Sequence, residues 1–205
     1  LSFREFETAK RLAAELRAAG VEVTTGVGGT GVVALMKNGA GPTVMMRADM
    51  DGLPVPEKTD LPYASKATQL DVDGVEKPVM HACGHDAHMT ALVGTARRMA
   101  AMKDRWSGTL MLIGQPGEER LGGAQKMMQD GLWKRFGQPD YALAFHVSSD
   151  NEAGRISVRD SAAYAGADTV DIVVHGVGAH GASPHKGRDP VLIGSQIVVA
   201  PCSTS

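Results

Sequence analysis

The spacing of apolar residues changes several times along the chain, and each spacing predicts a different element. Near the N-terminus, Leu12 and Leu16 recur at helical spacing and Gly20 ends the pattern, which predicts a helix. Residues 21–27 and 31–37 are short apolar segments on either side of the glycine-rich stretch GVGGTG. A strand follows these glycines where a phosphate-binding loop needs a helix, so we interpret the region as a β-hairpin.

Strand and helix patterns then alternate through the middle of the chain. Strand patterns occupy 42–49 and 109–115, and their parts 43–46 and 109–113 are continuously apolar, as in strands that are covered on both faces. Helical patterns follow at 85–102 and 123–131, and a third apolar strand pattern occupies 141–147. This order predicts an α/β fold with a mostly parallel sheet between layers of helices.

Beyond the last of these strands, the pattern becomes that of a sheet with one exposed face. The segment DTVDIVVHG at 168–176 alternates polar and apolar residues, which predicts a half-exposed strand, and a new helical pattern begins at Pro190. We therefore expect a domain boundary near 154–162 and divide the chain into a first domain, 1–158, and an incomplete second domain, 159–205.

The two ends of the sequence have the pattern of interrupted elements. The chain begins without methionine inside the first helical pattern, and the segment PCSTS interrupts the apolar face that Ile193, Ile197 and Val198 begin. We interpret this tail as the product of a shifted reading frame or as an artificial end. We therefore expect a longer parent protein with sequence missing on both sides.

Composition and charge narrow the classes of function. The 205 residues are 43% hydrophobic and 21% charged with a formal net charge of −2, which is ordinary for a soluble globular protein. This charge excludes a broad basic surface for nucleic acid or anionic lipid, and no apolar run approaches the ~20 residues that span a bilayer. We expect a cytoplasmic protein whose partners are small molecules or other proteins. Two cysteines do not make a disulfide framework, so Cys83 is expected to be a free thiol or a ligand.

Coordinating side chains are concentrated at the start of the predicted helix 85–102. The segment MHACGHDAHMTALVG brings together His81, Cys83, His85, Asp86 and His88. Cys83 and His85, two residues apart, can point to the same side if this stretch is extended. His81 and His88, each taken alone, are more typical of hydrogen-bonding residues than of ligands, so we expect them to support the ligands.

Further polar side chains lie at the carboxyl ends of the predicted strands. Asp49 and Asp51 come at the end of the first parallel strand, Glu118 and Glu119 after the second, and His146 at the end of the third. Ligands bind outside the carboxyl ends of the strands in open α/β sheets, so these segments are expected to converge there. A thiolate, imidazoles and carboxylates around one crevice predict a metal site.

Five separated segments resemble one family in order, spacing and strand context. They are MRADMDGLPVPE, MHACGHDAHMTALVG, LIGQPGEERLGGAQKMMQDG, AFHV and GVGAHGASPHKGRDP. They are similar to the successive motifs of the dinuclear-metal amidohydrolases that include hippurate hydrolase, N-acyl-amino-acid amidohydrolases and plant auxin-conjugate hydrolases. The resemblance implies a zinc-exopeptidase-like catalytic domain followed by the beginning of a ferredoxin-like α+β lid, through which the complete protein forms a homodimer.

The resemblance also implies a role for each candidate residue. Glu118 would be the catalytic base, and His180 would stabilise the developing oxyanion, often across a dimer. The metal ligands would be Cys83, His85, Glu119 and His146, and the residues that support them would be Asp49, Asp51, Asp86, His81 and His88. Two divalent ions, Mn²⁺ or Zn²⁺ first and Co²⁺ or Ni²⁺ as further options, would activate a water molecule to cleave the amide bond of an N-acyl-amino acid.

Two other interpretations stay open at this point. The family's last histidine ligand has no counterpart in this sequence, so the chain is expected to be inactive as it stands, a catalytically silent fragment of such an enzyme. The other alternative is a thiol hydrolase with Cys83 as nucleophile and His85 or His146 as base. This mechanism gives Glu118 and Glu119 no role. Metal dependence separates the two chemistries, because chelation does not abolish thiol catalysis.

Overall fold

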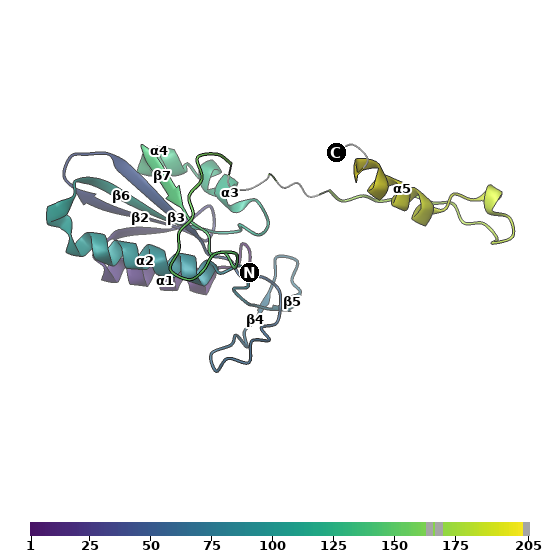
Figure 1. The fold of residues 1–205 in the computed structure, drawn as a ribbon, viewed down its shortest axis with the longest axis horizontal. Coiled ribbons are helices and arrows are strands. Elements are labelled where there is room, and N and C mark those ends of the chain that lie inside the picture. Colours follow the sequence, from purple (N-terminus) through teal and green to yellow (C-terminus); the bar gives the residue numbers. More distant parts are fainter. Residues whose placement is uncertain (163–165, 167–169, 203–205) are drawn as a thin grey trace. The chain divides into compact units, whose positions relative to one another are not determined.

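The computed structural model describes residues 1–162, 166 and 170–202 of the chain (Figure 1). The chain divides into two compact units, Leu1–Ala153 and Gly154–Ser205, and each is described by itself. Among the described residues, no helix combines the length and the apolar character that crossing a membrane requires.

A five-stranded sheet forms the centre of the first unit. Its strand order is β1-β2-β6-β3-β7. The strands are β1 (Glu22–Val27), β2 (Gly31–Asn38), β3 (Thr43–Asp49), β6 (Gly108–Gln115) and β7 (Tyr141–Ala144). β2 is antiparallel to both β1 and β6, whereas β3 is parallel to both β6 and β7. The parallel ladders therefore bring the carboxyl ends of β3, β6 and β7 to one edge of the sheet.

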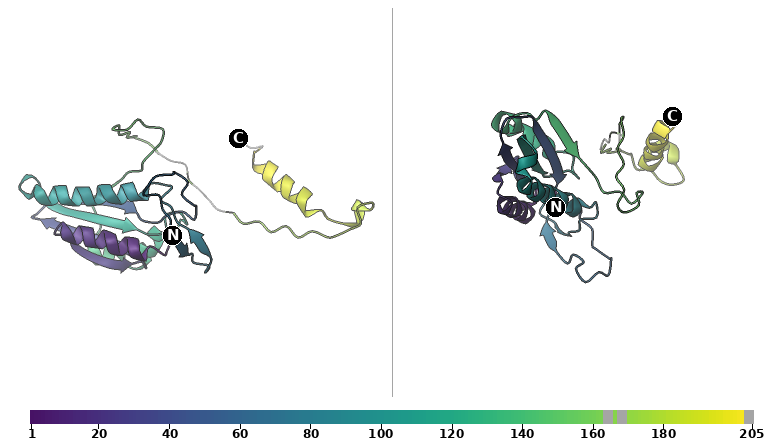
Figure 2. Two further views of the ribbon diagram at one scale, coloured as in Figure 1. Left: turned by 90° about the horizontal axis from the view of Figure 1, so that it is seen from below. Right: turned by 60° about the vertical axis from the view of Figure 1, so that its left-hand side comes forward.

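Helices cover both faces of this sheet, which confirms the predicted α/β class (Figures 1 and 2). α1 (Phe6–Ala18) and α2 (His85–Ala101) pack on one face, and α3 (Gly123–Gln129) and α4 (Leu132–Phe136) pack on the other. Side chains alternate between the two cores along the central strands β2 and β6: Val32 contributes to the core beneath α1 and α2, and Val33 to the core beneath α3 and α4. Coverage on both faces explains why the central strands are apolar without interruption.

Several elements were not predicted from the sequence. The long connection between β3 and α2 contains a hairpin of β4 (Thr68–Leu70) and β5 (Glu76–Pro78), and a short 3₁₀ helix, Lys103–Arg105, follows α2. α4 also lies beyond the predicted helix 123–131. Three-residue strands and one-turn helices are too short to produce a periodic apolar pattern, which explains why they were missed.

The second unit contains little regular structure. It has a short 3₁₀ helix, Pro184–Lys186, an isolated bridge between Val177 and Arg188, and α5 (Pro190–Cys202). The predicted strand 168–176 is not formed over residues 170–176, and residues 168 and 169 lie outside the described part. A half-exposed strand needs a neighbouring strand to pair its backbone, and the described part of this unit provides none. The expected interruption at Pro201 falls within the last turn of α5.

Candidate metal centre

The residues proposed as ligands converge at the edge of the sheet where β3, β6 and β7 end. Asp49 is the last residue of β3, and the Glu118–Glu119 pair follows β6. His146 follows β7, and α2 begins at His85 next to the same edge. Three sets of side chains each place their donor atoms within 4.8 Å of one another: Cys83, His85 and His146; His85, Glu118 and Glu119; and Asp49, His85 and His88. His85 belongs to all three sets and lies at the centre of the cluster.

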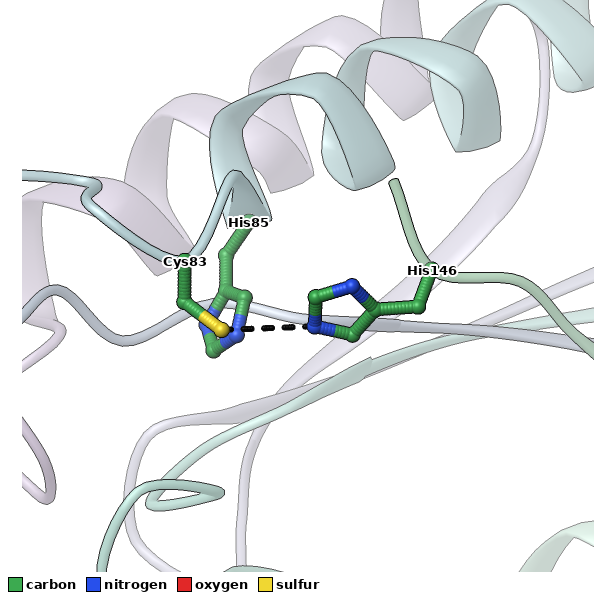
Figure 3. Close-up of side chains that lie close together, drawn as sticks. All are labelled: Cys83, His85 and His146. Carbon is green, nitrogen blue, oxygen red and sulfur yellow. Dashed lines mark hydrogen bonds between the residues drawn. The ribbon is translucent and has the colours of Figure 1, made fainter. Parts of the chain in front are cut away.

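Cys83 and His146 meet in front of His85 (Figure 3). The Cys83 sulfur lies 3.3 Å from Nε2 of His146. Gly84 makes this approach possible, because its φ of +78° favours glycine and a Cβ atom there would lie 2.3 Å from a methyl carbon of Val147. The glycine of the CGH motif thus lets the start of α2 close onto the segment that carries His146.

The His85 ring has the orientation of a metal-binding imidazole. Its Nδ1 donates a hydrogen bond of 2.8 Å to the backbone carbonyl of Asp51, which leaves the lone pair on Nε2 free. Within the described part of the chain, this buried Nε2 and the buried Oε1 of Glu119 have no hydrogen-bond partner, and they lie 3.8 Å apart. Buried polar atoms are rarely left unpaired unless they have another partner, so this pair of atoms fits a metal ion.

Burial and neighbouring carboxylates shift the pKa values of Glu119 and His85. Burial and the charge of Glu118 raise the pKa of Glu119. Burial lowers the pKa of His85, but the hydrogen bond to Asp51 and the charges of Asp49 and Asp51 outweigh it, so the net direction is upward. The same negative charge that favours a proton on these groups favours a metal cation between them.

The Cys83 thiol is disfavoured as a nucleophile by its surroundings. Burial, followed by the charge of Glu119 and a hydrogen bond to Glu119, raises the pKa of Cys83 to about 11. A catalytic thiol needs the opposite shift, because the thiolate is the reactive form. The direction of this pKa shift does not favour the thiol-hydrolase alternative, and Cys83 stays a candidate ligand, because a bound cation would deprotonate the thiol.

His88 is fully buried behind the cluster and has no free lone pair. Its Nε2 accepts a hydrogen bond of 3.0 Å from the backbone N–H of Val147, so the ring proton lies on Nδ1 and is donated to Asp49 over 2.6 Å. Both nitrogens are therefore engaged, and His88 is placed to hold the residue after His146 rather than to bind an ion.

Asp51 has more contacts than sequence reasoning assigned to it. Besides the contact of its carbonyl with His85, its buried carboxylate accepts hydrogen bonds from the Ser2 hydroxyl at 2.7 Å and from the backbone N–H groups of Glu118 and Glu119 at 3.1 Å each. Burial alone raises the pKa of Asp51, but its hydrogen bonds outweigh this effect and lower the pKa to about 2. The carboxylate is therefore held ionised in the interior.

The three remaining candidates, Asp86, His81 and His180, belong to none of these three sets of side chains, and their roles stay predictions. Asp86 is exposed and accepts a hydrogen bond of 3.0 Å from the neighbouring Ala87 N–H at the start of α2. Burial lowers the pKa of His81, whose Nδ1 has no partner among the described residues. His180 belongs to the second unit, where it is exposed and its Nδ1 accepts a hydrogen bond of 3.1 Å from the Ala182 N–H.

Two charged residues near the cluster, Arg47 and Glu5, were not predicted from the sequence. Arg47 on β3 contacts Asp49, with Nη1 2.8 Å from Oδ2, and compensates part of the buried negative charge. Glu5 is 2% exposed and contacts the loop before Glu118. A signal for Glu5 was present, because it falls in phase with the buried face of α1, on which Ala9 and Leu16 also lie.

Comparison with known proteins places the chain in a family. A model of the peptidase family M20/M25/M40 matches residues 45–195. The chain belongs to this family. The expected relationship to dinuclear-metal amidohydrolases is thereby confirmed at family level, and so is the α/β class of the catalytic domain.

Members of the M20 family that resemble the chain come from several organisms. Thermostable carboxypeptidase 1 of Saccharolobus solfataricus is 43% identical over 204 residues, which cover 98% of this chain and 49% of that protein. Hippurate hydrolase of Campylobacter jejuni is 40% identical, with 98% and 49% covered. The crystal structure of Bacillus subtilis YXEP, described as a dinuclear metal-binding peptidase of the M20 family, matches with a TM-score of 0.63 and 34% identity over 73% of this chain and 39% of that chain. The chain spans about half the length of the curated relatives it matches.

Proposed function

We propose that the chain is part of a metal-dependent amidohydrolase that cleaves the amide bond of N-acyl-amino acids. The observation that carries this proposal is a pair of buried atoms, His85 Nε2 and Glu119 Oε1, which have no hydrogen-bond partner among the described residues and lie next to Cys83 and His146. The substrate class rests on kinship with the relative named hippurate hydrolase, because hippurate is an N-acylated glycine. The second-unit residue His180, a homodimer and a cytoplasmic location belong to the same proposal.

Cys83, His85, Glu119 and His146 would hold two divalent ions. Imidazole and thiolate suit Zn²⁺, whereas the carboxylates leave room for Mn²⁺, with Co²⁺ and Ni²⁺ as further options. Such ions, when bound, supply a water molecule of lowered pKa and polarise a carbonyl group.

Glu118 is the residue that we assign as general base. Its side chain is 34% exposed, compared with 21% for Glu119, and its Oε2 lies 4.0 Å from Nε2 of His85. It is therefore more open to substrate and water than its neighbour. Its carboxylate accepts the proton of the attacking water and returns it to the nitrogen of the leaving amine, so that the amide C–N bond breaks and a carboxylate and an amine are released.

The metal assignment is tested by elemental analysis of this chain after exposure to Mn²⁺ or Zn²⁺ and removal of free ions. Cys83→Ser is expected to retain markedly less metal, whereas Cys202→Ser, which changes the other cysteine of the sequence, keeps the metal content of the parent. Equal metal content in Cys83→Ser and the parent chain contradicts the ligand set.

The reaction is tested by hydrolysis of N-benzoylglycine and N-acetyl-amino acids by the whole protein. Turnover is expected to stop with a chelator and to return with Mn²⁺ or Zn²⁺. Turnover that persists in chelator but is lost on alkylation of Cys83 supports the thiol alternative. Turnover by the whole protein, together with metal retention but no turnover by the 205-residue chain, supports the silent-fragment alternative.

A further inference from the structure

The loop that carries the two glutamates is held by three successive backbone N–H groups. The Gly117 N–H donates to Oε1 of Glu5 at 2.8 Å. The Glu118 and Glu119 N–H groups donate to Oδ1 and Oδ2 of Asp51 at 3.1 Å each. Two buried carboxylates from separate segments thus fix consecutive residues of one loop.

Burial of the Glu5 carboxylate costs free energy. It is 2% exposed at the start of α1, on the face where the following turns of the helix bury apolar residues. Its other hydrogen bonds come from the Phe3 backbone N–H and the Thr30 hydroxyl, so its three donors are neutral groups. Burial of a carboxylate is expensive even when it is hydrogen-bonded, and an apolar residue in such a place often gives equal or greater stability. What a carboxylate provides here, and an apolar residue could not, is an acceptor for three hydrogen bonds, one of them from the loop of Glu118 and Glu119.

The contacts of Glu5 are arranged to set the position of the loop. One carboxylate oxygen receives both the Phe3 and the Gly117 N–H groups, and the other receives Thr30 from the connection between β1 and β2. The N-terminal segment is in turn anchored, because the Ser2 hydroxyl donates to Asp51. Glu5 and Asp51 therefore both accept hydrogen bonds from the backbone of the same loop, and they come from different segments of the chain.

We propose that Glu5 is a positioning residue that fixes the loop 116–119 and thereby the placement of Glu118 and Glu119. The proposal deepens the proposed function, since it rests on these glutamates acting as base and ligand. Glu5 does not touch the metal cluster, and its effect passes through the Gly117 backbone.

The first test is amide hydrogen exchange of the metal-free chain, which does not depend on the proposed function. Glu5→Leu keeps the size of the side chain but removes the acceptor. It is expected to raise the exchange rate of the Gly117 amide by about tenfold or more relative to the amides of β6. Glu5→Gln retains one carbonyl oxygen and is expected to rescue most of the protection. Leu16→Ala destabilises the same helix without touching the loop, and it should leave the ratio of Gly117 to β6 exchange unchanged.

The second test reads the metal cluster by Co²⁺ titration. In the parent chain, coordination by Cys83 gives a thiolate-to-cobalt charge-transfer band. Glu5→Leu is expected to weaken Co²⁺ binding by about tenfold, the low end of the effect of removing a direct partner of a ligand, because Glu5 acts through the Gly117 backbone. Glu5→Gln and Leu16→Ala, measured at a temperature where both are folded, should bind Co²⁺ within a few-fold of the parent.

The outcomes separate the two proposals. If the parent chain shows no thiolate-to-cobalt band, the proposed metal site is wrong, and the exchange of Gly117 still decides the role of Glu5. If Gly117 exchange and Co²⁺ affinity in Glu5→Leu match those in Leu16→Ala, the positioning role is overturned. Should Glu5→Leu fail to fold, Glu5→Ala takes its place, because it leaves room for water next to the Gly117 N–H. It must then show the same faster exchange.

Discussion

The backbone N–H of Val147 donates a hydrogen bond of 3.0 Å to Nε2 of His88. Val147 directly follows His146, so a buried residue of α2 holds the segment that presents a proposed ligand. The other ring nitrogen of His88 donates to Asp49 at the end of β3. His88 thus joins α2 to the ends of two strands, although it contributes no lone pair to an ion.

Replacement of His88 by leucine is expected to loosen the metal cluster. The variant leaves the buried Asp49 carboxylate and the Val147 N–H each short of one hydrogen bond. We expect the free energy of unfolding to fall by about 1–3 kcal/mol and the affinity for Zn²⁺ or Mn²⁺ to fall by about 10–100-fold. Chemical denaturation and metal titration measure the two effects, with His175→Gln on the exposed surface as the control. Unchanged metal affinity in the folded His88→Leu protein contradicts this role.

The neighbouring glutamates are expected to respond differently to the same substitution. Glu118→Gln should retain metal but lower amide hydrolysis by the whole protein by about 10²–10⁴-fold, because the general base is lost. Glu119→Gln should lose metal as well, since its buried Oε1 is one of the donor atoms. Elemental analysis beside a hydrolysis assay distinguishes the two roles. Equal metal loss in both variants removes the proposed division of labour.

Acid should weaken the metal-free protein through Asp51. Its folded-state pKa of about 2 lies below the ordinary value of 3.8, so the ionised carboxylate stabilises the fold above pH 3.8. This contribution, about 2 kcal/mol, is lost as the pH falls from about 4 towards 2. In chelator-treated protein, the difference in unfolding free energy between the parent and Asp51→Asn should therefore shrink over that window. A difference that is constant from pH 6 to pH 2 contradicts the assignment.

Substitution of Gly123 by alanine is expected to disrupt the loop 116–119, which carries Glu118 and Glu119. A Cβ atom there would lie 1.4 Å from the carbonyl oxygen of Pro116, and a backbone atom cannot move aside as a side chain can. We expect Gly123→Ala to lower the free energy of unfolding by about 2–4 kcal/mol. Gly94→Ala in α2 meets no atom within 4 Å and should stabilise the protein by about 0.5–1 kcal/mol. Thermal denaturation of both variants is the measurement, and equal effects would show that the loop can shift.

The sequence was sufficient to predict the central sheet and the convergence of the candidate ligands. Continuous apolar strands indicate a sheet covered on both faces, and parallel strands end at one edge. The position of Glu119 and His146 beside His85 follows from these two rules. The pairing of β2 with β6 could not be predicted in this way, because strand order depends on contacts between distant segments.

The supporting contacts were harder to predict than the ligands. Asp51 was expected to support a ligand imidazole, and its carbonyl does accept a hydrogen bond from His85; the two backbone N–H groups that its carboxylate also accepts were not predicted. The phase of Glu5 with the buried face of α1 could have indicated its burial, but not its contacts, because Thr30 and Gly117 are remote in sequence and Gly117 donates through its backbone.

The pairing of β3 with β6 and β7 also determines when the metal cluster can form. Val44 pairs with Leu110 on one side and with Tyr141 on the other. Closing loops of this length costs chain entropy before the strand contacts offset it, so parallel ladders of this kind fold slowly. Because His146 follows β7, the four proposed ligands come together only after β7 has paired with β3. An ion that requires all four donors would then bind to a sheet that is already assembled, unlike the ion of small zinc-dependent domains, which drives folding.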